Sequence, residues 1–275
     1  MSSVQAFTPA RSHVVAVIIV LTAFLFARSW LQVSLRDGGL ARLHAADLSY
    51  LVFWPVLLLL LLPVLRENSD GLRRLFNLSR LNVRLVLSAI AIGLLLRLAW
   101  WSQLIAGISF GLYSSDDVNA IVGPQFEFEC PQWYVLALGF LVMAILVPVT
   151  EEIINRGFVQ SALDRFGALA AITGSAVIFT VYHPPMNWFF VFFAGVVLGT
   201  QFRITRTLWS SLCTHATVNG LIQLDWRCLR GQWNPPASDI PLKLTGSVAA
   251  VLCMACVAAI TAILWKMHRG DLSPR

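Results

Sequence analysis

Eight long apolar blocks, separated by short polar connectors, dominate this sequence. Apolar residues make up 57% of its 275 residues and charged residues only 12%, against about 25% charged in an ordinary soluble domain. A block of about 18 apolar residues can cross the roughly 30 Å hydrocarbon core of a bilayer as one helix. The sequence therefore predicts an all-α, polytopic transmembrane helix bundle of about eight spans. The predicted spans are residues 14–34, 48–65, 83–106, 133–163, 167–183, 187–202, 206–224 and 244–266.

The basic residues of the connectors predict which side of the membrane each connector faces, because Lys and Arg are enriched on the cytoplasmic side. With a cytoplasmic N-terminus, the inner segments hold 12 of the 20 Lys and Arg residues and the outer segments hold 5. We therefore expect an integral membrane protein with both its N- and C-termini in the cytoplasm. The net charge of +6 follows from this anchoring and indicates no nucleic-acid partner.

The five cysteines form no metal-binding pattern. Cys253 and Cys256 make a C-x-x-C inside an apolar block, where small packing residues are the simplest explanation. Cys130 and Cys228 both fall in predicted outer connectors. A disulfide between them is possible if the protein meets an oxidising compartment.

The first polar cluster lies at membrane depth in the fourth block, where ionisable side chains are costly and usually functional. Glu152 and Arg156 are four residues apart, so they face each other on a helix and can pair. Glu151 points about 100° away on the same helix and has no such partner, which makes it the better candidate for a general base. Pro148 lacks an N–H group, so it frees a carbonyl one turn earlier and bends the helix beside the pair.

Two further polar elements come from other blocks. His183 ends the fifth block, where the Pro-Pro pair that follows stops the helix. His215 and Asn219 are four residues apart in the seventh block, so both side chains project from one face. Counted from the predicted inner helix ends, Glu151, His183 and His215 lie roughly 13 to 24 Å deep at the α-helical rise. The sequence therefore predicts an enclosed, water-containing site built from three helices.

The order of these residues carries a family resemblance. EExxxR, FxxxH and HxxxN in succession resemble the CPBP family, the CAAX-protease and bacteriocin-processing family of glutamic-type intramembrane proteases, which includes the type II CAAX prenyl endopeptidases. The motif residues are Glu151, Glu152, Arg156, Phe179, His183, His215 and Asn219. The resemblance divides the chain into residues 1–132, with three transmembrane helices and an acidic outer connector; 133–224, a CPBP-like protease core; and 225–275, an outer connector and the final helix.

The resemblance implies an intramembrane endopeptidase that hydrolyses a peptide bond of a membrane-associated protein or peptide, in a bacterial inner (plasma) membrane. Glu151 and His183 would activate a water, and His215 and Asn219 would position that water or stabilise the oxyanion. Glu152, Arg156 and Phe179 would support the site. The substrate class stays open between CAAX-type proteins, C-terminal sorting tags and leader peptides, because no feature specific to prenyl groups is found.

The family arrangement implies no cofactor, and H-E-x-x-H, the zinc-protease motif, is absent from the sequence. If the protein needs zinc, then Glu151, His183 and His215 would be its ligands. Two other classes of function remain. One is a non-catalytic immunity or scaffold protein of the same fold. The other is a proton-coupled transporter that uses the buried Glu and His, although the hydropathy pattern shows no inverted repeat.

Overall fold

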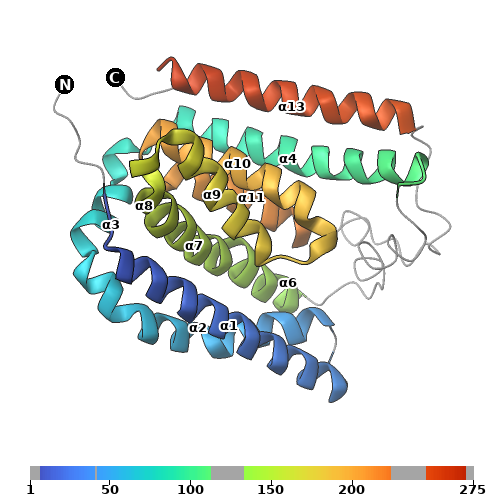
Figure 1. Cartoon of the computed structure of the whole chain (residues 1–275). Helices are drawn as coiled ribbons and strands as arrows, with labels where there is room; N and C mark the ends of the chain where they lie inside the picture. Colours follow the sequence, from blue (N-terminus) through green and yellow to red (C-terminus); the bar gives the residue numbers. More distant parts are fainter. Residues whose placement is uncertain (1–6, 41, 113–132, 224–245, 271–275) are drawn as a thin grey trace.

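The computed structural model describes residues 7–40, 42–112, 133–223 and 246–270, and all eight apolar blocks form helices in it. The fold class predicted from the sequence is confirmed: the described chain is an all-α bundle (Figure 1). The helices of the first half are α1 (Arg11–Asp37), α2 (Arg42–Glu67), α3 (Ser69–Leu75), η1 (Leu78–Arg80) and α4 (Val83–Ser109). The central helix is divided into α6 (Trp133–Gly139), η2 (Phe140–Leu146), α7 (Val147–Glu152), η3 (Ile153–Gln160), α8 (Ser161–Leu163) and η4 (Asp164–Phe166). The last elements are α9 (Ala168–Val181), η5 (Pro185–Asn187), α10 (Trp188–Thr205), α11 (Leu208–Gln223) and α13 (Gly246–His268).

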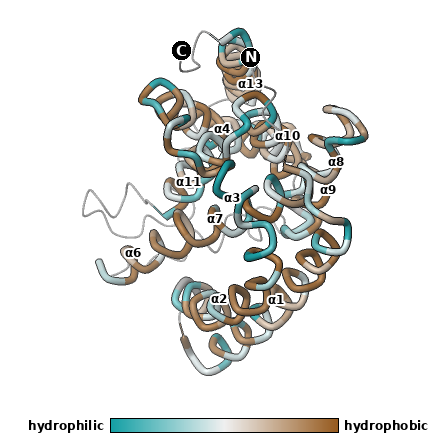
Figure 2. Tube along the Cα trace, turned by 90° about the vertical axis from the view of Figure 1, so that its left-hand side faces the viewer, coloured by the Kyte–Doolittle hydropathy of each residue, from teal (hydrophilic) through white to brown (hydrophobic). Residues whose placement is uncertain are grey.

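Six of these helices are long and apolar enough to cross a membrane, counting the central helix as one. Two others are shorter: α9 has 14 residues and α11 has 16. The protein is therefore an integral membrane protein, with two short helices among its longer spans. Large hydrophobic side chains such as Phe26 of α1 and Leu59 of α2 are exposed, as expected of a lipid-facing surface, and Figure 2 shows both helices mainly in the hydrophobic colour.

The helices form three layers. The pair α1 and α2 lies on one side of the central helix, and the pair α4 and α13 covers the other side of the bundle (Figures 1 and 2). Between these pairs lie the central helix, α9, α10 and α11. Helix α1 begins, and α13 ends, at the same end of the bundle (Figure 1).

Close backbone contacts hold the inner helices together. A Cβ atom at Gly93 of α4 would lie 2.7 Å from Cβ of Thr217 on α11. A Cβ at Gly195 of α10 would lie 3.0 Å from Cβ of Ala176 on α9. Glycine at these two positions lets the backbones approach, which is how helices commonly associate in a bilayer. The helices that carry His183 and His215 are therefore fixed against their neighbours.

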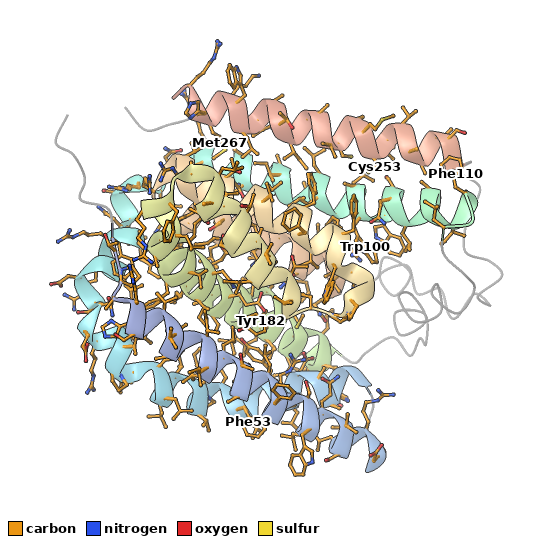
Figure 3. The ribbon with its side chains drawn as sticks, in the orientation of Figure 1. Phe53, Trp100, Phe110, Tyr182, Cys253 and Met267 are labelled. Atoms are coloured by element: carbon orange, nitrogen blue, oxygen red, sulfur yellow. The ribbon has the colours of Figure 1, made fainter. Side chains whose placement is uncertain are left out.

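The outer pair α1 and α2 contacts the central helix mainly through apolar side chains, with a few polar links. The buried residues Phe24 and Leu57 pack in one cluster with Ile154 and Phe158 of the central helix. A hydroxyl contact of 3.1 Å joins Thr22 on α1 to Tyr182, which lies at the end of α9 beside the outer pair (Figure 3). The outer pair thus closes one side of the polar centre of the bundle.

Candidate functional site

The helix that carries the two glutamates contains two π-helical segments. Glu151 and Glu152 end α7, a six-residue α-helical segment, and α7 is flanked by the π-helices η2 and η3. Short π-helical segments inside α-helices occur frequently at functional sites. The winding brings the two carboxylates to the centre of the bundle, where the side chain of Glu152 is 1% exposed and that of Glu151 is 21% exposed.

Pro148 explains one cross-link between the central helix and α11. In η2 the N–H of Val147 bonds to the carbonyl of Val142, five residues earlier. The next such bond would run from residue 148 to the carbonyl of Met143, but proline has no N–H to donate. Asn219 supplies the missing donor, because its Nδ2 donates to the Met143 carbonyl at 3.0 Å. The freed carbonyl predicted from Pro148 therefore has a partner on another helix.

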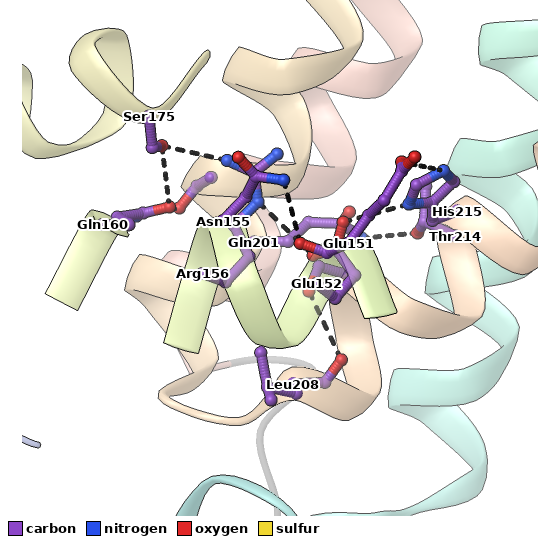
Figure 4. A network of polar contacts seen from close by, with 12 residues as sticks. Glu151, Glu152, Asn155, Arg156, Gln160, Ser175, Gln201, Leu208, Thr214 and His215 are labelled. Carbon is purple, nitrogen blue, oxygen red and sulfur yellow. Dashed lines mark hydrogen bonds and ion pairs between the residues drawn. The ribbon is translucent and has the colours of Figure 1, made fainter. Parts of the chain in front are cut away.

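The ion pair predicted from the four-residue spacing is present and fully buried. Arg156 Nε lies 3.3 Å from Glu152 Oε2, and the Arg156 side chain has no exposed surface. Arg156 Nη1 donates to Ser175 Oγ at 2.9 Å, and that hydroxyl contacts Gln160 Oε1 at 3.3 Å. Gln160 Nε2 in turn donates to the carbonyl of Gly199 at 2.8 Å. This network ties the central helix to α9 and α10 (Figure 4).

His215 lies between the two glutamates. Its Nδ1 is 3.1 Å from Glu152 Oε1, and its Nε2 is 3.6 Å from Glu151 Oε2 (Figure 4). Glu152 is already paired with Arg156, and it can hold the ring in place by accepting a hydrogen bond from the Nδ1–H group. Glu151 Oε2 is buried and accepts no hydrogen bond within the described part of the chain. Glu152 Oε2 also accepts no hydrogen bond, but it lies 3.3 Å from Arg156 Nε, so Glu151 is the carboxylate without an arginine partner.

His183 reaches the same region from the end of α9. Its Nδ1 lies 2.8 Å from the carbonyl oxygen of Phe179. A carbonyl can only accept, so Nδ1 carries the proton and Nε2 keeps a free lone pair. The Phe179 ring lies 4.7 Å from the His183 ring and 5.7 Å from the His215 ring, between centroids. Phe179 thus contacts both imidazoles and fixes their separation.

A cavity of about 170 Å³ adjoins these groups. Its lining contains His183, His215 and Asn219 together with apolar and aromatic side chains of α4, α9, α10 and α11. One water needs roughly 10–15 Å³ of such space, so the cavity can hold more than a solvent molecule. Glu151 does not belong to the described lining and lies against His215 instead. The structure thus brings His183, His215 and Asn219 to one cavity and places Glu151 Oε2 3.6 Å from His215 Nε2.

The arrangement does not gather a metal-ligand set. Within the described ranges, no three His, Cys, Asp or Glu side chains are placed to hold one ion. Cys130 and Cys228, the predicted disulfide partners, lie outside the described residues. Cys253 and Cys256 are free thiols on α13.

Three contacts in the site were not predicted. Trp54 of α2 donates from Nε1 to Thr150 Oγ1 at 3.0 Å, one residue before Glu151. Asn187 and Arg97 line the cavity. Of these, only Arg97 left a signal in the sequence, as a charged residue inside an apolar block. Trp54 and Asn187 resemble ordinary interfacial residues until the helices are assembled.

Together, the fold and site define a membrane protein that encloses paired carboxylates, imidazoles and a cavity within its helix bundle. The family model described as Type II CAAX prenyl endopeptidase Rce1-like matches residues 132–221. This segment, about a third of the chain, contains every motif residue, so the resemblance predicted from the sequence is confirmed. Comparisons with curated proteins and with solved structures found no match.

Proposed function

We propose that this protein is an intramembrane endopeptidase that hydrolyses a peptide bond of a membrane-associated protein or peptide. The observation that carries the proposal is the His215 ring between Glu151 and Glu152, beside a cavity lined by His183 and Asn219. The match of residues 132–221 to a protease family supports it. A CAAX-type C-terminus, a C-terminal sorting tag and a leader peptide are the candidate substrates.

The proposed chemistry is the attack of water on a peptide carbonyl. Glu151 accepts a proton from the water, and the hydroxide adds to the carbonyl carbon, which gives a tetrahedral oxyanion. His215 positions the water: its Nδ1–H donates to Glu152, so its Nε2 can accept a hydrogen bond from the water. The proton that Glu151 took from the water passes through His183 Nε2 to the leaving nitrogen, so that the C–N bond breaks to an acid and an amine and Glu151 returns to its carboxylate form.

Asn219 has a limited role in this scheme. One of its two amide N–H groups is held by the Met143 carbonyl, which leaves the second N–H for the oxyanion or the water. The fixed N–H sets the direction of the free one. No metal is needed in these steps, and we expect cleavage to persist in the presence of a strong chelator.

Mutation of the site residues tests the proposal. The protein is co-expressed with candidate membrane-anchored substrates, and cleavage is followed by the size of the product. We expect Glu151→Gln, His183→Ala and His215→Ala each to abolish cleavage while the protein still accumulates in the membrane. Glu67→Gln is the matched control, because that carboxylate is 64% exposed and contacts only His13 among the described residues. Full cleavage by Glu151→Gln would rule out the glutamate mechanism, and a substrate bound but never cleaved would favour the scaffold class.

We also propose that both termini face the cytoplasm. The common position of the start of α1 and the end of α13 supports their lying on one side of the membrane (Figure 1), and the connector charges favour the inner side. A green fluorescent protein fused after Arg275 is expected to fluoresce, because it folds in the cytoplasm. If alkaline phosphatase fused at the same position were active instead, the C-terminus would lie outside the cytoplasm and the proposed orientation would be wrong.

A further inference from the structure

The outer helix pair reaches the proposed reaction centre through one tryptophan. Trp54 of α2 donates from Nε1 to Thr150 Oγ1 at 3.0 Å, and Thr150 directly precedes Glu151 in the chain. The segment that matches the family model, residues 132–221, does not include α2. The contact therefore joins α7 to a helix that contains none of the motif residues.

The place of Trp54 within α2 differs from that of an interfacial tryptophan. Helix α2 runs from Arg42 to Glu67, so 12 of its residues precede Trp54 and 13 follow it. Tryptophan is enriched at the two membrane interfaces, where its N–H group meets water. The middle of a span offers no such water, and a polar group without a partner is costly there. A phenylalanine would supply a similar apolar ring, so the N–H group at this position serves as a donor to Thr150.

The acceptor of this hydrogen bond is itself held in place. Thr150 Oγ1 donates to the carbonyl of Leu146 at 2.7 Å, which leaves its lone pairs for Trp54. Tyr50, one turn earlier in α2, places its hydroxyl 3.5 Å from the same carbonyl. The ring of Phe24 packs on Tyr50 with 5.3 Å between centroids. Because Leu146 is the last residue of η2, the outer pair holds the junction between η2 and α7.

The direction of the Glu151 side chain depends on this junction. Glu151 Oε2 accepts no hydrogen bond within the described part of the chain and lies 3.6 Å from His215 Nε2, so the backbone has to direct the carboxylate. That backbone is the six-residue α7, which has a π-helix on either side. Because the winding is irregular on both sides, contacts with other helices are needed to fix the rotation of α7 about its axis. Glu152 makes one such contact with His215, and Trp54 makes another from α2.

We propose that Trp54 is a positioning residue for the reaction. Its hydrogen bond to Thr150 sets the rotation of α7 and so keeps the Glu151 carboxylate directed toward His215 and the attacking water. The inference rests on the proposed peptidase function, in which Glu151 accepts the proton of that water. Trp54 touches neither the water nor the substrate in this scheme and acts through Thr150. The outer helix pair thereby becomes part of the catalytic arrangement.

Kinetics of a conservative substitution test the role of the N–H group. The full-length protein in nanodiscs is given a membrane-anchored peptide that it cleaves. We expect Trp54→Phe, which keeps an aromatic ring and removes the donor, to lower kcat about three- to tenfold, a range that one interhelical hydrogen bond can supply. KM should change by less than about twofold, because Trp54 is not among the described residues that line the cavity. Trp30→Phe on α1, where the side chain is 70% exposed, is the matched control and should keep both constants.

A double-mutant cycle tests whether Trp54 acts through Thr150. Thr150→Val keeps the branched shape and removes the hydroxyl, so it should lower kcat by itself. In that background we expect Trp54→Phe to lower kcat no further, because the acceptor is already gone. Two losses that multiply, an unchanged kcat in Trp54→Phe, or a higher KM at unchanged kcat would each overturn the inference.

Chemical labelling measures the position of Glu151 without a substrate. A water-soluble carbodiimide with glycine ethyl ester modifies accessible carboxylates, and mass spectrometry compares the modification of Glu151 with that of the exposed Glu67. Because a loosened α7 exposes its carboxylate more often, Trp54→Phe should raise this ratio about twofold or more, and Trp30→Phe should not. A raised ratio in a protein that cleaves no substrate would keep the positioning role and reject the peptidase. An unchanged ratio with normal cleavage would reject the positioning role and keep the peptidase.

Discussion

The contact between Asn219 and Met143 gives the sharpest test of how the central helix is built. The Met143 carbonyl lacks a helical donor because residue 148 is proline, and Asn219 Nδ2 fills that place at 3.0 Å. Asn219→Leu keeps the branched shape and the number of heavy atoms but removes the donor. A buried carbonyl left without a donor costs about 1–3 kcal/mol, whereas interhelical hydrogen bonds in membranes average about 0.6 kcal/mol with a maximum near 1.7. We therefore expect the free energy of unfolding to fall by about 1–1.5 kcal/mol.

The same substitution is expected to cost much less in a Pro148→Ala background. Alanine restores an N–H that can reach a carbonyl of the preceding turn, so Asn219 is no longer its only source of a donor. A double-mutant cycle should then show a coupling energy of about 1 kcal/mol. Unfolding in mixed micelles with increasing SDS, followed by loss of helical circular dichroism, measures all four proteins. A coupling below about 0.3 kcal/mol would refute the reasoning, because it would mean that the proline and the asparagine act independently.

Three further changes follow from other contacts. Glu152→Gln leaves the buried Arg156 without a counter-charge, so we expect about 3–5 kcal/mol of destabilisation. Additional replacement of Arg156 by Met should recover part of this loss. If the double variant recovered no stability, the pairing of the two residues would be contradicted. Gly93→Ala is expected to cost about 1–3 kcal/mol through its clash with α11. Gly157→Ala, whose Cβ would have no neighbour closer than 3.6 Å, should be tolerated, and thermal unfolding compares the two variants. Asp164→Asn should cost no more than about 1 kcal/mol, because its partners Arg203 and Arg206 are a third exposed; a cost that persists in high salt would argue against a screened pair.

Most of the fold could be predicted from the sequence, because bilayer crossing imposes a length and an apolar composition on each helix. The same holds for contacts within one helix. The Glu152–Arg156 pair follows from spacing alone and is found at 3.3 Å. Sequence spacing could not reveal the two π-helices, since the residues of η2 and η3 are ordinary helix formers and only the hydrogen-bond pattern differs.

Contacts between helices were less predictable. The sequence placed Glu151, His183 and His215 at similar depth but could not say which imidazole meets which carboxylate. In the structure His215 touches both glutamates, whereas His183 bonds to the carbonyl of Phe179 in its own helix. Rotation of each helix about its axis decides such pairings, and that rotation depends on the packing of all neighbours. The place of Arg97 in the cavity lining could not be predicted for the same reason, because the cavity exists only after α4, α10 and α11 meet.

The shortness of α9 has a consequence for the surrounding lipid. Its 14 residues span about 21 Å, well below the roughly 30 Å of a typical hydrocarbon core. Leu169, Val177 and Val181 on this helix point outward, so acyl chains beside it must compress to match it, which thins the bilayer locally. The turn that carries His183 then sits close to headgroup water although the flanking spans are full length. Lipids with shorter tails relieve this mismatch. The thickness of the bilayer therefore affects how deep in the membrane the end of α9 that carries His183 lies.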